Sequence, residues 1–89
     1  MTVKVYGSNL CPDTLHALET LSQNGISPAF INVTGSINLL ADWVLTRDTN
    51  PLFEKSRGTR SVGFPTFEFE DGTMTRNIED VISRFAAEK

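Results

Sequence analysis

The sequence predicts a single α/β domain over residues 1–89, with the element order β-α-β-α-β-β-α and a four-stranded mixed sheet that has helices on both faces. Three observations support this prediction. Short runs of alternating apolar and polar residues are twice followed by a segment with apolar residues at helical spacing. An Asp-Gly pair between two further short runs is typical of a hairpin. An amphipathic segment then closes the chain.

The first half of the chain predicts a strand, a helix and a second strand. Residues 3–6 alternate as in a short strand and end at a Gly-Ser-Asn turn. Residues 12–24 carry leucines at helical spacing, and Gly25 supplies the stop signal. Residues 29–33 alternate again. Because the links are short, we expect two parallel strands joined by the helix in a βαβ unit.

A second helix is predicted over residues 37–47, with Ser36 as its cap. Its apolar side chains fall on one stripe, which predicts that this stripe faces the core. Trp43 lies off the centre of the stripe, and we expect it to be partly exposed. After Pro51, residues 52–55 predict one or two further helical turns. The stripe consists of Ile37, Leu40, Ala41, Val44 and Leu45.

The last third of the chain predicts a hairpin and a third helix. Residues 66–70 and 73–76 are short strands on either side of the Asp-Gly turn. Asn77 and Asp80 resemble a helix cap, and the apolar residues of 78–85 fall at helical spacing. The helix therefore packs one face on the sheet.

Composition excludes several classes of protein. The net charge of −3 and the pI near 4.9 leave no basic patch for nucleic acid or an anionic membrane. The first residues lack the pattern of a secretory signal, and no apolar run approaches the roughly 20 residues that span a bilayer. One cysteine cannot form an internal disulfide. We expect a cytoplasmic, monomeric protein.

The only cysteine of the chain, Cys11, stands where a loop meets the first predicted helix. Pro12 suits the first helical position, because its φ is fixed and its missing N–H is not needed there. The N–H groups of Asp13 and Thr14, and the Thr14 hydroxyl, would stabilise a thiolate, whereas the Asp13 carboxylate would oppose it. We expect an exposed, reactive Cys11 with a lowered pKa. The competing interpretation is a buried cysteine beside an ordinary first turn.

Three motifs make the sequence similar to the glutaredoxins of the thioredoxin superfamily, and to the small glutaredoxin-related proteins in particular. They are Cys-Pro-Asp-Thr at residues 11–14, Gly-Phe-Pro-Thr at residues 63–66, and the Asp-Gly hairpin at residues 71–72 before the closing helix. Their order and spacing match the predicted elements, and the resemblance covers nearly the whole chain. It implies a thioredoxin-like fold.

The resemblance also implies a reaction. Pro65 would be a cis-proline facing Cys11, and the unpaired backbone of Phe64 at that strand end would bind glutathione as an extra short strand. Cys11 would attack the glutathione sulfur of a mixed disulfide, release the other thiol, and be regenerated by a second glutathione. Dithiol members have a cysteine where this chain has Thr14, so the mechanism would be monothiol. Glutathione is the expected co-substrate, and glutathionylated or disulfide-containing proteins are the expected partners.

Two places depart from the family pattern. Ser8 stands where glutaredoxins carry a lysine that pairs with a glutathione carboxylate. Residues 75–77 replace the Gly-Gly and acidic residue that receive the γ-glutamyl end. Arg47, Arg57 or Arg60 could supply the missing cation, and spacing does not choose among them. Arg47 is the candidate we assign to substrate binding.

No metal is expected, because one cysteine and one histidine cannot form a zinc site within the chain, and His16 lies about 140° around the helix from Cys11. A cluster shared by two chains, as in monothiol glutaredoxins with Cys-Gly-Phe-Ser, is a lesser option. An alternative function is a binding module that holds an extended peptide or partner beside Phe64 and Pro65 with little turnover. The departures from the pattern favour the module, whereas Cys11 and Pro12 favour the enzyme.

Overall fold

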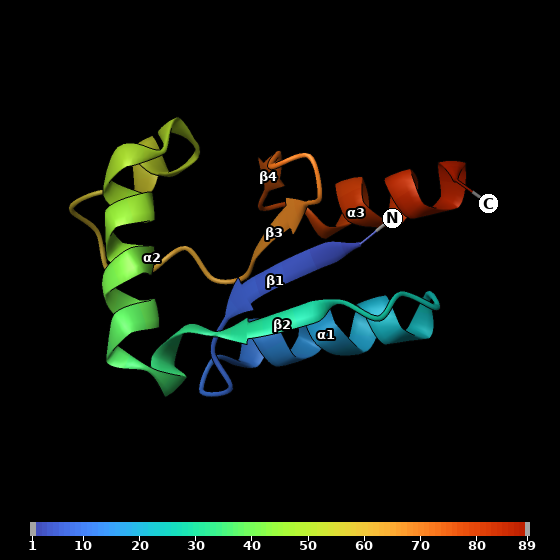
Figure 1. Ribbon diagram of the computed structural model, residues 1–89, viewed down its shortest axis with the longest axis horizontal. Coiled ribbons are helices and arrows are strands. Elements are labelled where there is room, and N and C mark those ends of the chain that lie inside the picture. The colour runs from blue at the N-terminus through green and yellow to red at the C-terminus, as the bar shows by residue number, and fades with distance from the viewer. Residues whose placement is uncertain (1, 89) are drawn as a thin grey trace.

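The computed structural model describes residues 2–88 and contains a four-stranded sheet with the strand order β2-β1-β3-β4 (Figure 1). Strand β1 (Val3–Gly7) pairs in parallel with β2 (Ala29–Asn32) and antiparallel with β3 (Thr66–Phe69). Strand β4 (Met74–Thr75) completes the hairpin with β3. The predicted element order and the mixed sheet are confirmed.

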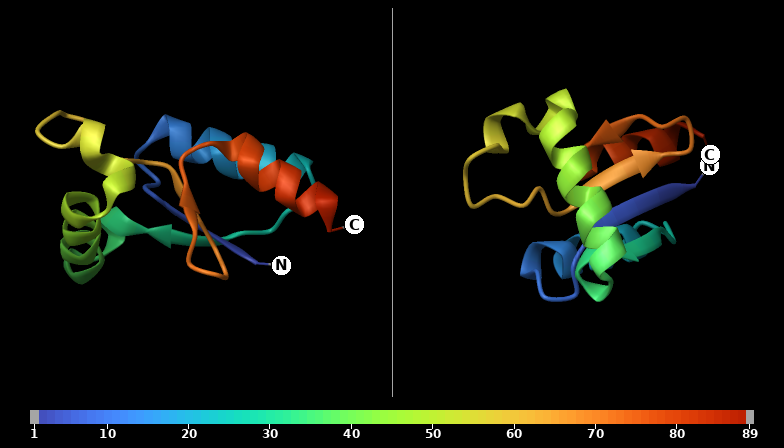
Figure 2. Two further views of the ribbon diagram at one scale, coloured as in Figure 1. Left: turned by 90° about the horizontal axis from the view of Figure 1, so that it is seen from above. Right: turned by 60° about the vertical axis from the view of Figure 1, so that its left-hand side comes forward.

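Helix α1 (Pro12–Gln23) connects β1 to β2, the segment that contains α2 (Ile37–Thr49) connects β2 to β3, and α3 (Ile78–Ala87) follows the last strand. Helices α1 and α3 lie side by side on one face of the sheet (Figure 2). Helix α2 stands across the end of the sheet where β1 and β2 finish, and packs against the other face (Figure 1). The 3-10 segments η1 (Val33–Gly35) and η2 (Pro51–Ser56) flank α2.

The main core fills the space between the sheet and the pair α1 and α3. Alternation along β1 turns Val3 and Val5 to this side, and the same alternation turns Phe67 and Phe69 of β3 to it. Leu21 of α1 packs against them and is fully buried. The buried members of this core are Val3, Val5, Ala17, Leu21, Ile26, Phe67, Phe69 and Val81.

A second, smaller core forms around Trp43, on the opposite face of the sheet. The indole stacks on Tyr6 with ring centroids 5.4 Å apart, and meets the ring of Phe53 edge-on at 5.4 Å. Its N–H donates a hydrogen bond of 2.8 Å to the Val62 carbonyl. Trp43 is 4% exposed, so the expectation that it is partly exposed is wrong. The indole ring and its N–H thus contact three different segments of the chain, namely β1, η2 and the loop that contains Val62.

The apolar stripe of α2 faces solvent, and the prediction that it faces the core is also wrong. Ile37 is 79% exposed and Leu45 is 64% exposed. Because α2 crosses the end of the sheet, it contacts the rest of the chain mainly along the side that carries Trp43. Residues two positions from Trp43, such as Ala41 and Leu45, lie about 160° around the helix from it.

The predicted caps of α2 and α3 are present. Ser36 Oγ accepts a hydrogen bond from the Leu39 N–H, and Asn77 Oδ1 accepts one from the Glu79 N–H at 3.0 Å. Asp80 instead accepts a hydrogen bond of 2.6 Å from the Thr75 hydroxyl. Within residues 2–88, none of the helices combines the length and the apolar character that a membrane crossing needs.

Truncating one leucine on each of two helices compares their burial. We expect Leu21→Ala to lower the free energy of unfolding by about 2–5 kcal/mol, because it leaves a cavity in the main core. Leu45→Ala should change it by less than about 0.5 kcal/mol, because the side chain is exposed. Urea unfolding followed by Trp43 fluorescence measures both values. Equal losses in the two variants would contradict the orientation of α2.

Candidate functional site

Cys11 is the N-cap residue of α1 and has extended backbone angles, φ −102° and ψ 115°. Pro12 occupies the first helical turn, as predicted. The Cys11 N–H donates a hydrogen bond of 3.0 Å to the Ser8 carbonyl, which closes a tight turn, and its own carbonyl accepts the N–H of Leu15 at 3.2 Å. The side chain is partly exposed. The interpretation of Cys11 as a sealed core residue is therefore excluded.

Thr14 locks the start of α1 against β1. Its side chain is fully buried, and its Oγ1 accepts a hydrogen bond of 3.4 Å from the Ser8 N–H. A Cβ on Gly7 would stand 2.5 Å from Thr14 Oγ1 and Cγ2, so only glycine fits at that position. Because Ser8 already donates to the oxygen, the hydroxyl is left to donate its own hydrogen to the Cys11 sulfur.

The surroundings of the sulfur favour the thiolate. The pKa of Cys11 is lowered, chiefly by the hydrogen bond from the Thr14 hydroxyl and further by the backbone N–H groups of Thr14 and Asp13. Partial burial and the negative charge of Asp13 act in the opposite direction. The predicted balance between helix start and Asp13 carboxylate is thus confirmed in direction. Cys11 ionises at a lower pH than an ordinary cysteine.

A groove of about 440 Å³ lies between α1, the Phe64–Pro65 loop and the start of α3. We call it the Arg76 groove, after its basic residue at the α3 end. Asp13, two residues after Cys11, lines it from the first turn of α1, the helix that Cys11 caps. The Phe64–Pro65 peptide bond is cis, as the resemblance implies.

The backbone of Phe64 is only half free. Its carbonyl accepts a hydrogen bond of 3.0 Å from Arg76 Nη2, so the expectation that both backbone groups are unpaired is wrong for the carbonyl. Its N–H has no hydrogen-bond partner among residues 2–88. A carbonyl oxygen has two lone pairs, so one remains for a ligand. An extended ligand can therefore still pair with both groups of Phe64.

Arg47 and Arg57 hold the segment after η2 against α2. Arg47 Nη2 lies 2.6 Å from the carbonyls of Ser56 and Ser61, and its Nε lies 2.9 Å from the latter. Arg57 Nη2 donates to the Asn50 carbonyl at 2.8 Å. The assignment of Arg47 to substrate binding stays a prediction, and most of its donors are already engaged.

Sequence reasoning missed Arg76 as a candidate binding residue. Spacing along the chain does not place it near Phe64, but the β3–β4 hairpin does, because Phe67 pairs with Thr75 and the chain then returns toward the Phe64–Pro65 loop. Only Nη2 of the guanidinium is engaged with Phe64. The remaining donors can bind a carboxylate.

Ser8 is buried and organises the loop that carries Cys11. Its Oγ lies 2.6 Å from Thr34 Oγ1 and accepts a hydrogen bond of 3.0 Å from the Leu10 N–H. Its side chain is uncharged and enclosed. The position at which glutaredoxins carry their lysine therefore offers no cation to a ligand.

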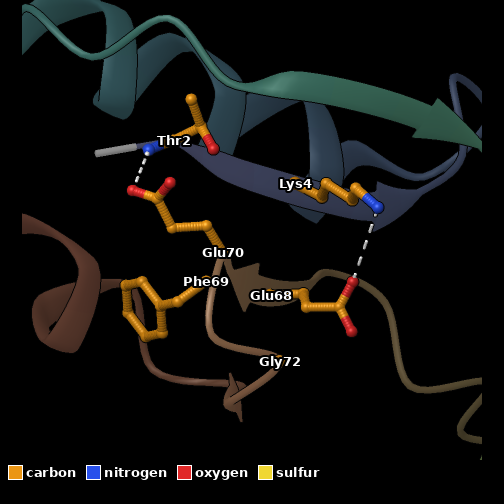
Figure 3. A pocket seen from close by; sticks show the side chains of 6 residues that line it. All are labelled: Thr2, Lys4, Glu68, Phe69, Glu70 and Gly72. Carbon is orange, nitrogen blue, oxygen red and sulfur yellow. Dashed lines mark hydrogen bonds and ion pairs between the residues drawn. The ribbon is translucent and has the colours of Figure 1, made fainter.

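Another hollow, on the open face of the sheet, lies at the start of β1 and away from the Cys11 loop (Figure 3). Its polar groups are engaged within the chain: Lys4 Nζ lies 3.9 Å from Glu68, and the backbone N–H of Thr2 donates to Glu70 at 3.1 Å. Burial and the hydrogen bond to Glu68 raise the pKa of Tyr6 to about 12.

Across residues 2–88, no three His, Cys, Asp or Glu side chains gather in a way that could hold a metal ion.

Thr14→Val removes the hydroxyl and keeps the shape of the side chain. We expect the pKa of Cys11 to rise, because the Thr14 hydroxyl is the largest cause of its lowering. Since the thiolate is the reactive form, the alkylation rate at neutral pH should fall and its pH profile should move upward. Thr14→Ser, which keeps the hydroxyl, is the control. An unchanged profile in Thr14→Val would mean that the hydroxyl does not contact the sulfur.

The site therefore combines a thiol that ionises readily, a groove lined by the first turn of the helix that this thiol caps, and a backbone N–H and an arginine that can donate hydrogen bonds to a ligand. This arrangement is suited to nucleophilic attack by sulfur. Comparisons with family models, curated proteins and solved structures found no match to the chain.

Proposed function

We propose that the chain is a monothiol, glutathione-linked thiol–disulfide oxidoreductase with a thioredoxin-like fold and Cys11 as its nucleophile. The observation that supports this proposal is the position of Cys11. It caps α1, whose first turn lines the Arg76 groove, and the Thr14 hydroxyl and first-turn N–H groups lower its pKa. A disulfide substrate with an extended chain requires a thiolate for the attack and an open backbone N–H to pair with the chain.

The reaction is an exchange between sulfurs. The Cys11 thiolate attacks the glutathione sulfur of a mixed disulfide; a new S–S bond forms, the old one breaks, and the other sulfur leaves as a thiolate. A second glutathione thiolate then attacks the glutathione sulfur on Cys11 and leaves as oxidised glutathione, which restores Cys11. One disulfide is consumed and one is formed, so the cycle needs no further electron carrier.

Glutathione would lie along Phe64 and in the Arg76 groove. Its cysteinyl backbone would pair with the free N–H and the remaining lone pair of Phe64. The carboxylate of the γ-glutamyl end, which the resemblance places near residues 75–77, would bind the unengaged donors of Arg76. Thr14 is buried where a resolving cysteine stands in dithiol enzymes, so regeneration must come from a second thiol molecule.

Two specific observations favour the alternative of a binding module with slow turnover. The family's lysine position is a buried serine, and the guanidinium of Arg47 is engaged with carbonyl oxygens. Both features weaken the attraction for glutathione carboxylates. The module would still hold an extended peptide at Phe64.

Replacing the nucleophile tests the proposed function directly. We expect the wild-type protein to form an adduct with one glutathione on exposure to oxidised glutathione, and to reduce cysteine–glutathione disulfide in the presence of glutathione. Cys11→Ser should lose both properties, because an alcohol does not replace the thiolate at neutral pH. Intact-mass measurement and a coupled reductase assay follow them. Undiminished turnover by Cys11→Ser would rule out Cys11 as the nucleophile. If the wild type formed no adduct and showed no turnover, the oxidoreductase would be ruled out and the binding module would be the remaining function.

Arg76→Gln tests the binding residue that the fold brings to the groove. We expect KM for cysteine–glutathione disulfide to rise about tenfold or more, because a hydrogen bond to a charged group contributes about 1.5–3 kcal/mol. Arg60→Gln is the matched control, because Arg60 is exposed and does not line the groove. A KM that is equal in the two variants would remove Arg76 from substrate binding.

A further inference from the structure

A chain of hydrogen bonds joins the loop after β1, which carries the thiol, to the end of β2. Ser8 Oγ accepts the Leu10 N–H at 3.0 Å and lies 2.6 Å from Thr34 Oγ1. Thr34 Oγ1 in turn donates to Asn32 Oδ1 at 3.2 Å, and the same oxygen accepts the Asn9 N–H at 3.2 Å. We call these bonds the Asn32 network. They tie three successive residues of the loop to the segment that follows β2.

The chemistry of the donors fixes the direction of the Asn32 network. A backbone N–H can only donate, so the Asn32 atom that faces the Asn9 N–H is the carbonyl oxygen, which only accepts. The Thr34 hydroxyl gives its one hydrogen to this oxygen, so the Ser8 hydroxyl donates to Thr34 Oγ1. Asn32 is therefore the terminal acceptor of the chain. Because bonds in such a chain polarise one another, removing this acceptor weakens all of them.

The residue between Asn32 and Thr34 belongs to the second core. Val33 is fully buried in the cluster that is built around Trp43, and Phe64 packs against the same cluster. The rings of Trp43 and Phe64 have their centroids 5.6 Å apart. Three successive residues therefore hold the thiol loop through their polar side chains and the Phe64 cluster through the apolar one. The segment after β2 thus connects the two parts of the candidate site, in addition to β1.

We propose that the Asn32 network positions Cys11 relative to Phe64 for attack on a bound disulfide, and that Asn32 is a positioning residue. This inference rests on the proposed function, in which the thiolate attacks a disulfide that the Phe64 backbone holds. The Cys11 N–H donates to the Ser8 carbonyl at 3.0 Å, so a shift of Ser8 moves the thiol. Asn32 does not line the Arg76 groove. A displacement of about 1 Å between reacting groups can cost about a hundredfold in rate.

The Asn32 network is separate from the groups that favour the thiolate. Those groups are the Thr14 hydroxyl and the first-turn N–H groups of Thr14 and Asp13, and Thr14 is held in place by its contact with Gly7. Loss of the Asn32 acceptor should therefore leave the ionisation of Cys11 unchanged and alter only its position relative to the second core. A small reagent that does not bind at the second core should react at the same rate.

Two rates measured on the same variants test this role. Alkylation by iodoacetamide across pH needs the thiol alone, whereas reduction of cysteine–glutathione disulfide needs the thiol and the bound substrate in the right relative position. In Asn32→Ala we expect kcat for the disulfide to fall about tenfold or more, with KM within about twofold of wild type, because the groups that bind the substrate remain. The alkylation rate and its pH profile should stay within about twofold of wild type.

Further variants separate positioning from a loss of stability. Asn32→Asp keeps an oxygen acceptor on a side chain of the same shape and should restore kcat. Thr34→Val breaks the network at an exposed side chain, outside both cores, and should lower kcat in the same way. Asn24→Ala is the matched control, because it removes a side-chain hydrogen bond of 2.8 Å at the far end of α1 and should keep kcat. Circular dichroism checks that each variant is folded.

The other outcomes distinguish the positioning role from the function on which it rests. A wild type without turnover would overturn the proposed function and this inference with it. Wild-type turnover together with an unchanged kcat in Asn32→Ala and Thr34→Val would overturn the positioning role alone. So would a loss of kcat that Asn32→Asp fails to restore, or a rise in KM without a fall in kcat. Alkylation slowed as much as turnover would show that the network acts on the reactivity of the sulfur, which also contradicts the proposal.

Discussion

The contact of Thr14 with Gly7 is the constraint on which the candidate site depends. It joins the first turn of α1 to the last residue of β1, and there is no room for a Cβ between them. The same threonine accepts the Ser8 N–H and donates toward the sulfur of Cys11. A single buried side chain therefore fixes the position of the thiol and contributes most to lowering its pKa.

The site lies between two cores, and β1 belongs to both. Val5 faces the main core under α1 and α3, whereas its neighbour Tyr6 stacks on Trp43 in the second core. Cys11 is positioned by the main core through α1, and Phe64 is positioned by the second core through Trp43. The geometry between thiol and groove therefore depends on the short strand that connects the two clusters.

The order of the elements could be predicted because each is specified by local patterns of apolar residues, turns and caps. The orientation of α2 could not, because an apolar stripe at helical spacing gives no information on which neighbour covers it. The helix stands across a sheet end, and Trp43 is the residue that it buries against the rest of the chain. For the site, the resemblance predicted Cys11 and the cis Pro65, but Arg76 was missed. Its place depends on the hairpin register, since extending the pairing of Phe67 with Thr75 by one residue leads to Arg76.

The arginines of this chain illustrate why position along the sequence does not identify a ligand-binding cation. A guanidinium that already satisfies loop carbonyls, as Arg47 does for Ser56 and Ser61, could turn to a ligand only by leaving those oxygens without that donor. Arg76 uses one nitrogen on Phe64 and keeps its other donors for a ligand. The free guanidinium donors of the site are thus on the α3 side of Phe64, in a groove that the carboxylates of Asp13 and Glu79 also line. A ligand carboxylate in this groove would be attracted by Arg76 and repelled by these two like charges, so its binding would depend on direct contact with the guanidinium.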